Sequence, residues 1–423
     1  MGELFEHIPP EYALAIPPAS AAYHPDLTSA FQARFGDRLL RTEFATFSND
    51  MPLHLVGEAG KILLVSTFNG DNWREASVEI AYFGNALTDN PDEAGPNTRE
   101  LGIFFPFADL RQDARTRKPI KDSVGRAIVK AQGVTDRALA KIIRHVAGAH
   151  FVCFVDMHNP WKSAKAFTEQ DLDVINLSTN KILTEYLVAN ELLSSNLETT
   201  VVSTDMGIYL TAYDLSGKIG KAMNADKEPV PMVIFKKTRV GTDVIPEHIY
   251  GDLKGKRAIV IDDIIGSGTT LEETIEAILK YDPAELLIFI PHPVYAPKGY
   301  YEKLENILKI DKVKLLMVAD TLPLVRQGIS YPHPYLKFDG GKKVEVLKIH
   351  DWIAEKAHTI LTARNIEEAI KILAEEIVEL EDPYQLITEM TAITVTPEPN
   401  VAVYYEGQKY VPIPMYREIF RSP

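Results

Sequence analysis

The chain has 423 residues, of which 46% are hydrophobic, and carries a formal net charge of −14. This length accommodates two α/β domains with an appendage, and the hydrophobic fraction is large enough to fill their cores. The acidic balance argues against nucleic acid or an anionic membrane as the partner. An anionic substrate would therefore need local basic residues and metal ions.

Compartment signals in the sequence are few. No stretch approaches the roughly 20 apolar residues that span a bilayer, and the first residues lack a charged-then-apolar signal pattern. The single cysteine, Cys153, lies in the apolar run Phe151–Val155, where a packed core thiol is the expected role. We therefore expect a cytoplasmic protein without disulfides.

Apolar segments of strand length alternate with segments of helical periodicity along most of the chain. The predicted strands are Lys61–Ser66, Leu101–Pro106, Phe151–Asp156, Thr200–Ser203, Met232–Phe235, Ala258–Ile261, Leu286–Ile290 and Lys314–Val318. The predicted helices are Pro25–Phe35, Thr135–Val146, Ser178–Ala189, Leu271–Lys280 and Pro297–Asn306. This alternation predicts an α/β protein with doubly wound parallel sheets.

The pattern changes beyond Lys343. Ile366–Leu380 has the periodicity of an acidic amphipathic helix, and Val401–Ile413 is typical of a short hairpin. The sequence thus predicts three units: an N-terminal domain over 1–175, a second domain over 176–342, and a small α+β extension over 343–423.

The segment from Arg257 to Ile278, RAIVIDDIIGSGTTLEETIEAI, contains the strongest functional signal. A predicted strand ends at Asp262 and Asp263, and a loop of small residues leads to a helix start. Small residues let backbone N–H groups approach a phosphate, and a helix N-terminus favours its negative charge. The two carboxylates suit ribose hydroxyls or a hydrated magnesium ion. The pattern predicts a ribose-phosphate site; an ordinary βα turn with a capped helix is the alternative, and a Walker A loop is excluded because no Gly-Lys-Ser/Thr follows.

Polar residues also follow three other predicted strands. The segment FFPFADLRQD ends in Arg111, Gln112 and Asp113, where Arg can hold a nucleotide's phosphates and Gln and Asp can read a purine edge. His158, in VDMH, could ligate a divalent ion or meet a phosphate, and Asp205 follows the strand in VVSTDMG. The simpler alternatives are a solvated basic loop, a structural histidine and a helix N-cap.

In this order the motifs resemble those of ribose-phosphate diphosphokinases, the phosphoribosyl diphosphate (PRPP) synthetases. The resemblance runs from about Ser20 to about Leu324 and includes SAAYHPDLTSAFQARFG, STFNGDNWRE, FPFADLRQDART, FVDMH and VVSTDMG. Lys237-Thr238-Arg239 is similar to the Lys-x-Arg of the family's catalytic flexible loop, and Asp320-Thr321 to its late Thr-Asp-Thr segment. The acidic pair with its small-residue loop also resembles that of type I phosphoribosyltransferases.

The resemblance implies two domains of the type I phosphoribosyltransferase kind, and it implies a role for each motif. The ribose 5-phosphate site would consist of Asp262, Asp263, Gly266, Ser267, Gly268, Thr269 and Thr270. ATP would be bound by Phe47, Arg111, Gln112 and Asp113. Mg²⁺ would be positioned by His158 and Asp205, and catalysis would depend on Lys237, Arg239 and His158.

The sequence also departs from the family's pattern. Thr46-Phe47-Ser48-Asn49-Asp50-Met51 stands where the family has the adenine-contacting Arg-Phe-Pro-Asp-Gly-Glu. Phe47 can still stack on a base, but Met51 replaces the Glu, so nucleotide identity and subunit contacts stay open. The segment 117–133 is longer than the family pattern, and the tail after Lys343 has no counterpart in it.

The implied activity converts ATP and ribose 5-phosphate to PRPP and AMP with Mg²⁺, in a homo-oligomer built from dimers, up to a hexamer. One alternative is a type I phosphoribosyltransferase that consumes PRPP, although such an enzyme has no use for the Arg-Gln-Asp segment or the Lys-x-Arg. A noncatalytic regulatory relative is the other alternative. Lys237, Arg239 and His158 argue against it, because a regulatory surface needs none of them.

Overall fold

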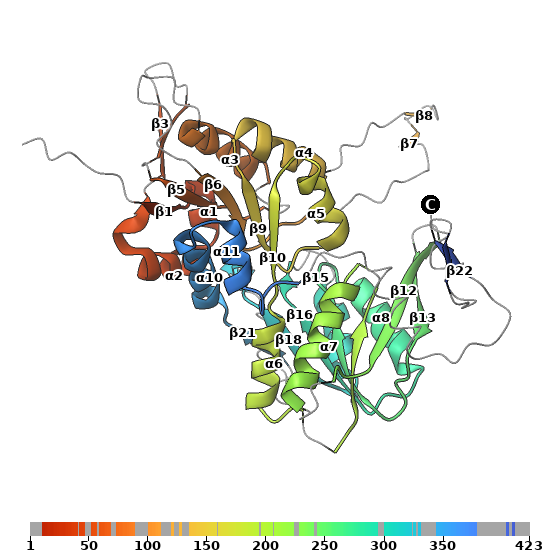
Figure 1. Cartoon of the computed structure of the whole chain (residues 1–423). Helices are drawn as coiled ribbons and strands as arrows, with labels where there is room; N and C mark the ends of the chain where they lie inside the picture. The colour runs from red at the N-terminus through yellow and green to blue at the C-terminus, as the bar shows by residue number, and fades with distance from the viewer. Residues whose placement is uncertain are drawn as a thin grey trace, which may run out of the picture.

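The computed structural model describes residues 11–40, 42–46, 52–56, 59–68, 73–88, 100–110, 120–121, 127–128, 135–158, 160–193, 196–205, 207–223, 228–240, 243–294, 300–323, 325–326, 329–330, 344–378, 403–405 and 408–410. They form two α/β units joined by a C-terminal segment that returns to the first unit (Figure 1). The expected fold class, two doubly wound parallel sheets, is confirmed.

The first unit is built on a six-stranded parallel sheet with the order β10-β9-β6-β5-β1-β2. Its strands are β1 (Tyr12–Ala15), β2 (Leu39–Leu40), β5 (Lys61–Val65), β6 (Glu100–Phe105), β9 (Phe151–Val155) and β10 (Asp173–Leu177). Its helices are α1 (Pro18–Tyr23), α2 (Pro25–Phe35), α3 (Trp73–Thr88), α4 (Thr135–Lys141) and α5 (Pro160–Thr168), with a 3₁₀ turn at Gly36–Arg38 and a π-helical turn at Ile142–Val146. Two antiparallel pairs accompany the sheet, β3 (Thr42–Thr46) with β4 (Pro52–Val56) and β7 (Ile120–Lys121) with β8 (Ala127–Ile128).

The second unit is built on a seven-stranded sheet with the order β13-β12-β11-β14-β16-β18-β21. Its strands are β11 (Thr199–Ser203), β12 (Met232–Val240), β13 (Asp243–Tyr250), β14 (Arg257–Ile261), β16 (Glu285–Ile290), β18 (Val313–Ala319) and β21 (Val344–Leu347). Neighbouring strands are parallel except for the β12–β13 hairpin. Its helices are α6 (Asn180–Ala189), α7 (Tyr209–Met223), α8 (Thr269–Leu279) and α9 (Tyr300–Lys309); the short pairs are β15 (Ile264–Ile265) with β17 (His292–Pro293) and β19 (Val325–Arg326) with β20 (Ile329–Ser330).

Each predicted strand and helix in this part of the chain is present, with small differences at the ends. The strands are found because fully buried parallel strands carry near-continuous apolar runs. Side chains of β5 alternate between two buried clusters, with Leu63 in one and Leu64 in the other, and Ile259 and Val260 of β14 do the same. Both faces of each sheet are therefore covered.

The interior is continuous across the two units. One buried apolar cluster contains Leu63 and Val155 of the first sheet together with Ile259 and Met317 of the second. Apolar side chains of the segment after β21, such as Ile353, belong to the same cluster. The relative placement of the two sheets thus rests on a shared core, not on a linker alone.

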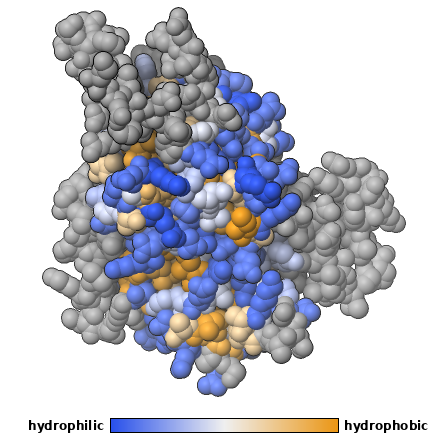
Figure 2. All heavy atoms as spheres, turned by 60° about the vertical axis from the view of Figure 1, so that its left-hand side comes forward, coloured by the Kyte–Doolittle hydropathy of each residue, from blue (hydrophilic) through white to orange (hydrophobic). Residues whose placement is uncertain are grey.

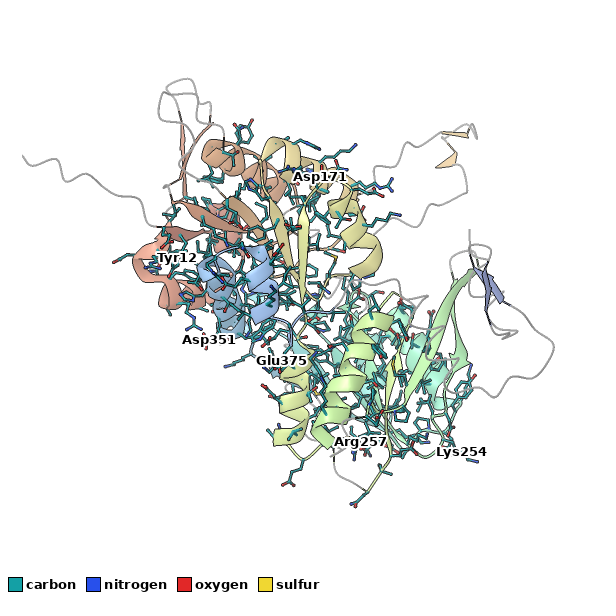
Figure 3. The ribbon with its side chains drawn as sticks, viewed as in Figure 1. Tyr12, Asp171, Lys254, Arg257, Asp351 and Glu375 are labelled. Carbon is teal, nitrogen blue, oxygen red and sulfur yellow. The ribbon has the colours of Figure 1, made fainter. Side chains whose placement is uncertain are left out.

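The strands of both sheets run toward the junction between the units. Figure 3 labels Asp171, just before β10, on the side of the first unit away from the second, and Arg257, the first residue of β14, on the far side of the second unit. The carboxyl ends of the two sheets therefore face each other. Open α/β sheets bind ligands at these ends, so the junction is where a site is expected.

The predicted domain boundaries need correction. The boundary at residue 175 falls inside β10, whose last residue is Leu177. The boundary at 342 precedes β21, which pairs with β18 as the edge strand of the second sheet. The region 343–378 is therefore not a separate extension: its first strand completes one sheet, and α10 (His350–Thr362) packs against α2 and β1 of the other unit (Figure 1). The expected hairpin near the end is confirmed by β22 (Val403–Tyr405) and β23 (Gln408–Tyr410).

The helix predicted over Ile366–Leu380 is too long. Helix α11 covers only Ile366–Ile372 (Figure 1), and the chain then turns toward the edge of the first sheet. There Ile377 forms an antiparallel bridge with Leu177 at the end of β10. The sheet edge offers unpaired backbone groups, and these compete with continuation of the helix.

Glu376 holds the chain after α11 against the end of β10. Its side chain is 8% exposed, and its Oε1 lies 3.1 Å from Nζ of the buried Lys356 and 3.3 Å from Nζ of Lys181 on α6. Its carbonyl accepts a hydrogen bond of 2.6 Å from the N–H of Ser178. One residue of the C-terminal segment thereby connects α10, α6 and the end of β10. In Figure 3 the neighbouring Glu375 is labelled at the place where the two units meet.

None of the helices in the described ranges has the length and apolar character needed to cross a bilayer. On the face drawn in Figure 2, hydrophilic surface predominates and the apolar areas form separate patches.

The position of Glu376 leads to a stability prediction with a matched control. Glu376→Ala leaves the buried Lys356 with the half-exposed Glu355 as its remaining carboxylate partner and should lower the free energy of unfolding by about 2–3 kcal/mol. Glu375→Ala removes the neighbouring carboxylate, which also contacts Lys181 but is 81% exposed, and should change it by less than about 0.5 kcal/mol. Urea unfolding of both variants measures the difference, and equal effects would contradict the anchoring role.

Candidate active site

The acidic pair lies at the carboxyl end of β14, in the middle of the second sheet. Asp262 is buried; its N–H donates to the carbonyl of Phe289 at 3.2 Å, and its Oδ1 accepts the N–H of Asp263 at 3.1 Å. Asp263 is less buried, and its side chain points toward the first unit, where it meets His158. The pair thus has one carboxylate fixed in its own sheet and one that reaches across the junction.

The small-residue loop ends at the first turn of α8. Gly268 adopts the left-handed region with φ 80°, which favours glycine over residues with a Cβ, and Thr269 begins the helix. The hydroxyl oxygens of Ser267 and Thr269 lie 3.3 Å apart at the end of this loop. N–H groups in the first turn of a helix lack intrahelical partners, so they and the hydroxyls can together accommodate a phosphate. The role predicted for Gly266, Ser267, Gly268, Thr269 and Thr270 is compatible with this geometry and stays a prediction.

His158 follows β9 and extends from the first unit. Its Nδ1 contacts Oδ2 of Asp263, which joins two motifs that are 105 residues apart. The Asp263 carboxylate is the largest influence and raises the pKa of His158 to about 9 against the opposing effect of burial, with further contributions from Asp205 and Asp262. At neutral pH the imidazole in this arrangement is therefore protonated. It places a positive charge between the acidic pair and the ends of the first sheet.

Asp205 follows β11, next to β14 in the second sheet. Its Oδ1 accepts N–H groups of Gly207 at 2.7 Å and Ile208 at 3.3 Å, just ahead of α7. These bonds form an Asx-type turn ahead of the helix and not an N-cap, because neither N–H belongs to α7. The same carboxylate is close enough to His158 to influence its pKa, so Asp205 belongs to the same electrostatic environment.

Asp156 is a site residue that sequence reasoning passed over. It adopts a positive φ of 43°, an uncommon conformation for a residue other than glycine, and lies buried at the end of β9. Its carboxylate accepts the hydroxyl of Thr179 at 2.5 Å and the N–H of Thr179 at 3.2 Å. Burial is the main cause that raises the pKa of Asp156 to about 7. A strained, buried acid two residues before His158 fixes the direction in which the chain leaves the strand.

A small pocket lies between these groups. Its lining comes from Asp156 and Met157 of the first unit, from the starts of α6 and α7, and from the acidic pair. The N–H of Met157 is held by Oδ1 of Asn176 at 2.9 Å, so the pocket wall is supported by β10. Sequence reasoning missed Asn176 because β10 itself was not predicted, and it missed Thr179 because this residue stands at the start of a predicted helix without a motif of its own. The sequence of β10, Asp173–Leu177, reads DVINL, which mixes polar and apolar residues.

The two predicted catalytic cations lie on the β12–β13 hairpin at one edge of the second sheet (Figure 1). The expected flexible loop is thus part of a regular ribbon: the backbone of Lys237 pairs with Pro246 and that of Arg239 with Val244. Positions two apart in a strand occupy the same face. Lys237 and Arg239 therefore share one face of the hairpin, and Lys236 takes a position on the other.

The predicted ATP-binding residues lie outside the described residues, namely Phe47, Arg111, Gln112 and Asp113, as does most of the segment 117–133. The structure does describe the chain that leads to Arg111. Strand β6 pairs with β9, and Leu110, the last described residue before Arg111, is buried. The described chain up to Leu110 thus leaves the sheet beside β9, the strand that precedes His158.

Comparisons with known proteins agree with this arrangement. Residues 181–321 match the phosphoribosyl transferase domain. A ribose-phosphate pyrophosphokinase from Caldanaerobacter subterraneus subsp. tengcongensis is 27% identical over 311 residues, which cover 71% of this chain and 84% of that protein. A protein of the same name from Mycoplasmopsis pulmonis is 25% identical over 328 residues, which cover 75% of this chain and 89% of that protein.

The crystal structure of phosphoribosylpyrophosphate synthetase from Mycobacterium smegmatis is similar in fold, with a TM-score of 0.56 at 18% identity, over 83% of this chain and 98% of that chain. The chain therefore contains a phosphoribosyl transferase domain and is similar over most of its length to PRPP synthetases. The family match to the phosphoribosyl transferase domain begins in α6 and ends just after β18, so it covers the acidic pair and the small-residue loop.

The described residues also bear on how magnesium could be bound. They contain no group of three or more His, Cys, Asp or Glu side chains arranged to hold a metal ion. Mg²⁺ is usually held by one or two carboxylates together with substrate phosphates and waters, not by a protein cage. The lack of such a group among the described residues is therefore compatible with an ion that arrives with a phosphorylated substrate.

The strained acid yields a pH-dependent prediction. Because the folded-state pKa of Asp156 is raised, folded wild-type protein keeps a proton that the unfolded chain has lost, and its stability falls as the pH rises toward 7. In Asp156→Asn the new side chain is compatible with a positive φ and carries no charge. The free energy of unfolding of this variant minus that of wild type should therefore increase by roughly 2 kcal/mol between pH 5 and pH 8.

Urea unfolding at both pH values measures this difference. Asp156→Ala is the control, because it also lacks the charge but cannot accept from Thr179 and adopts the left-handed backbone less readily; it should be less stable than Asp156→Asn at both pH values. A pH-independent difference between Asp156→Asn and wild type would contradict the raised pKa.

Proposed function

We propose that the protein is a ribose-phosphate diphosphokinase, which transfers the β,γ-diphosphoryl group of ATP to the anomeric hydroxyl of ribose 5-phosphate. The new bond joins the anomeric oxygen to the β-phosphorus, and the bond between that phosphorus and the α–β bridging oxygen breaks. PRPP and AMP are the products. The proton of the attacking hydroxyl is released during the transfer.

The observation that carries this proposal is the construction of the site from two units. The second unit supplies the acidic pair and the phosphate loop, and the first supplies His158 in contact with Asp263. A transfer between two phosphorylated substrates needs two anion-binding regions that face each other, since the reacting oxygens must line up. The opposed carboxyl ends of the two sheets provide this geometry, and the names of the relatives support the same activity.

Each group of residues would bind a different part of the substrates. The ribose hydroxyls would be held by Asp262 and Asp263, and the 5-phosphate by the loop Gly266–Thr270 at the start of α8. The protonated imidazole of His158 would lie against the diphosphoryl group from the first unit, where charge builds on nonbridging oxygens. ATP would approach from the Arg-Gln-Asp segment, which continues the chain that leaves β6 beside β9.

Magnesium would be held by phosphate oxygens and waters together with one or two of the carboxylates of Asp205, Asp262 and Asp263, and when bound it would neutralise charge on the phosphates. The carboxylate of Asp263 contacts the imidazole of His158. A cation near Asp263 would compete with the imidazolium for that carboxylate and leave His158 available to the phosphates.

A phosphoribosyltransferase would use the second unit in the same manner, so the reaction products must separate the two functions. Phosphorus NMR of the purified protein with ribose 5-phosphate, MgCl₂ and ATP should show AMP and PRPP formed in equal amounts. Other nucleoside triphosphates, tested in turn, should reveal the effect of the altered segment around Phe47.

Two outcomes would overturn the proposal. Release of pyrophosphate from added PRPP only when a base is present would indicate a phosphoribosyltransferase. A lack of turnover with every triphosphate, combined with an increase in the activity of a catalytic relative upon mixing, would indicate a regulatory protein.

The hairpin positions give a kinetic prediction. Lys237→Ala and Arg239→Ala should each lower kcat roughly a hundredfold with smaller changes in KM, because long cations at these positions would stabilise charge that develops mainly in the transition state. Lys236→Ala is the matched control, since it removes a lysine from the opposite face of the same strand and should stay close to wild type. Steady-state kinetics decide the point; a Lys236→Ala defect as large as the other two would indicate a general effect on the hairpin.

A further inference from the structure

His292 lies in the contact between the two units. It belongs to β17, just after β16 in the second sheet, and its side chain is buried. Phe107 of the first unit covers the ring, with 4.8 Å between ring centroids. None of the motifs that identify the family assigned this histidine a role.

The imidazole bonds to the first unit through the backbone that precedes His158. Its Nε2 lies 3.1 Å from the carbonyl oxygen of Val155 and 3.0 Å from that of Asp156. A carbonyl can only accept, so Nε2 carries the proton and donates to this pair of oxygens. Nδ1 lies 2.8 Å from the hydroxyl of Thr321, which holds the ring from the end of β18.

The backbone of the same residue bonds to the acidic pair. The N–H of His292 donates to the carbonyl of Asp263 at 3.1 Å. A single buried residue therefore connects the main chain of Asp263 in one unit with the main chain of Asp156 in the other. The side chains that meet across the junction, those of Asp263 and His158, start from these two backbone segments.

We propose that His292 is a positioning residue that fixes the separation of His158 and Asp263 across the junction of the two sheets. The proposal rests on the proposed function for its kinetic consequence. Ribose 5-phosphate would be held by the second unit alone, so its binding does not require the connection. Transfer requires groups from both units, and displacement by about 1 Å can lower a rate up to a hundredfold.

The test compares four forms of the full-length protein. His292→Phe keeps an aromatic ring against Phe107 but cannot donate, and His292→Gln restores an N–H donor near the position of Nε2. Ile288→Val, in the buried core of β16, is the control for simple loss of packing. Should His292→Phe not fold, His292→Asn replaces it, because the shorter amide can bond to Thr321 but cannot reach the two carbonyls.

We expect His292→Phe to lower kcat at least roughly tenfold, with the KM for ribose 5-phosphate changed by less than about threefold, and His292→Gln to recover most of the loss. Amide hydrogen exchange should accelerate at Asp156 and Met157 in His292→Phe and stay unchanged in α3. Ile288→Val should show neither the kcat loss nor the local exchange.

The proposal is overturned if His292→Phe retains wild-type kcat, if Ile288→Val loses as much, or if exchange rises evenly through the protein. Failure of the proposed function is recognised separately. If the wild-type protein makes no PRPP, the diphosphokinase assignment fails, and the exchange at Asp156 and Met157 still decides whether His292 positions the junction.

Discussion

The arrangement depends on one constraint: the carboxyl ends of two parallel sheets point at each other across a shared core. Strands β9, β11 and β14 are each followed by polar residues at the junction, and residues of the two units meet in the contact between His158 and Asp263. An isolated exposed pair of this kind would contribute little. Here the side chain of Asp263 is 13% exposed and that of His158 33%, and the backbone before His158 is held by buried hydrogen bonds, so their proximity is a property of the fold.

The C-terminal segment explains why the two sheets keep this orientation. It leaves the second sheet as β21, crosses to the first unit as α10, and returns to the end of β10 through Glu376. The returning strand piece bonds to Asn176 and Ser178, and Asn176 also supports Met157 in the pocket wall. The region that the sequence predicted as a separate extension thus supports the wall of the candidate site. It bonds to Asn176, which in turn bonds to Met157 in that wall.

The sequence was most informative where burial is complete. Strands such as Ala258–Ile261 and Phe151–Val155 are apolar throughout because both faces of a parallel sheet are covered, and this pattern needs no knowledge of the partner strand. The motifs at their ends were equally visible, since carboxylates and glycines after an apolar run have few structural explanations. Strands β10 and β21 were missed because each is only partly buried and carries polar residues whose partners come from distant segments.

Residues whose role depends on another unit were the hardest to predict. His292 and Thr179 lie in local sequences without a recognisable motif, and only the fold brings them to Asp156. The predicted length of the helix after Asn365 was wrong for the same reason. The apolar residues of Ile366–Leu380 have helical spacing, but Ile377 pairs with β10 instead. Local periodicity predicts which side chains need burial, and tertiary partners decide how the backbone provides it.

The continuous core also restricts how the site can close around its substrates. Hinge motion between the two units would separate apolar side chains such as Val155 and Ile259 that share one cluster, and it would break the bonds of His292 to the first unit. The β12–β13 hairpin is free of this restriction, because it is the edge of the second sheet and β13 pairs only with β12. In the proposed transfer, exclusion of water would therefore fall to the hairpin, with the two sheets as a fixed frame.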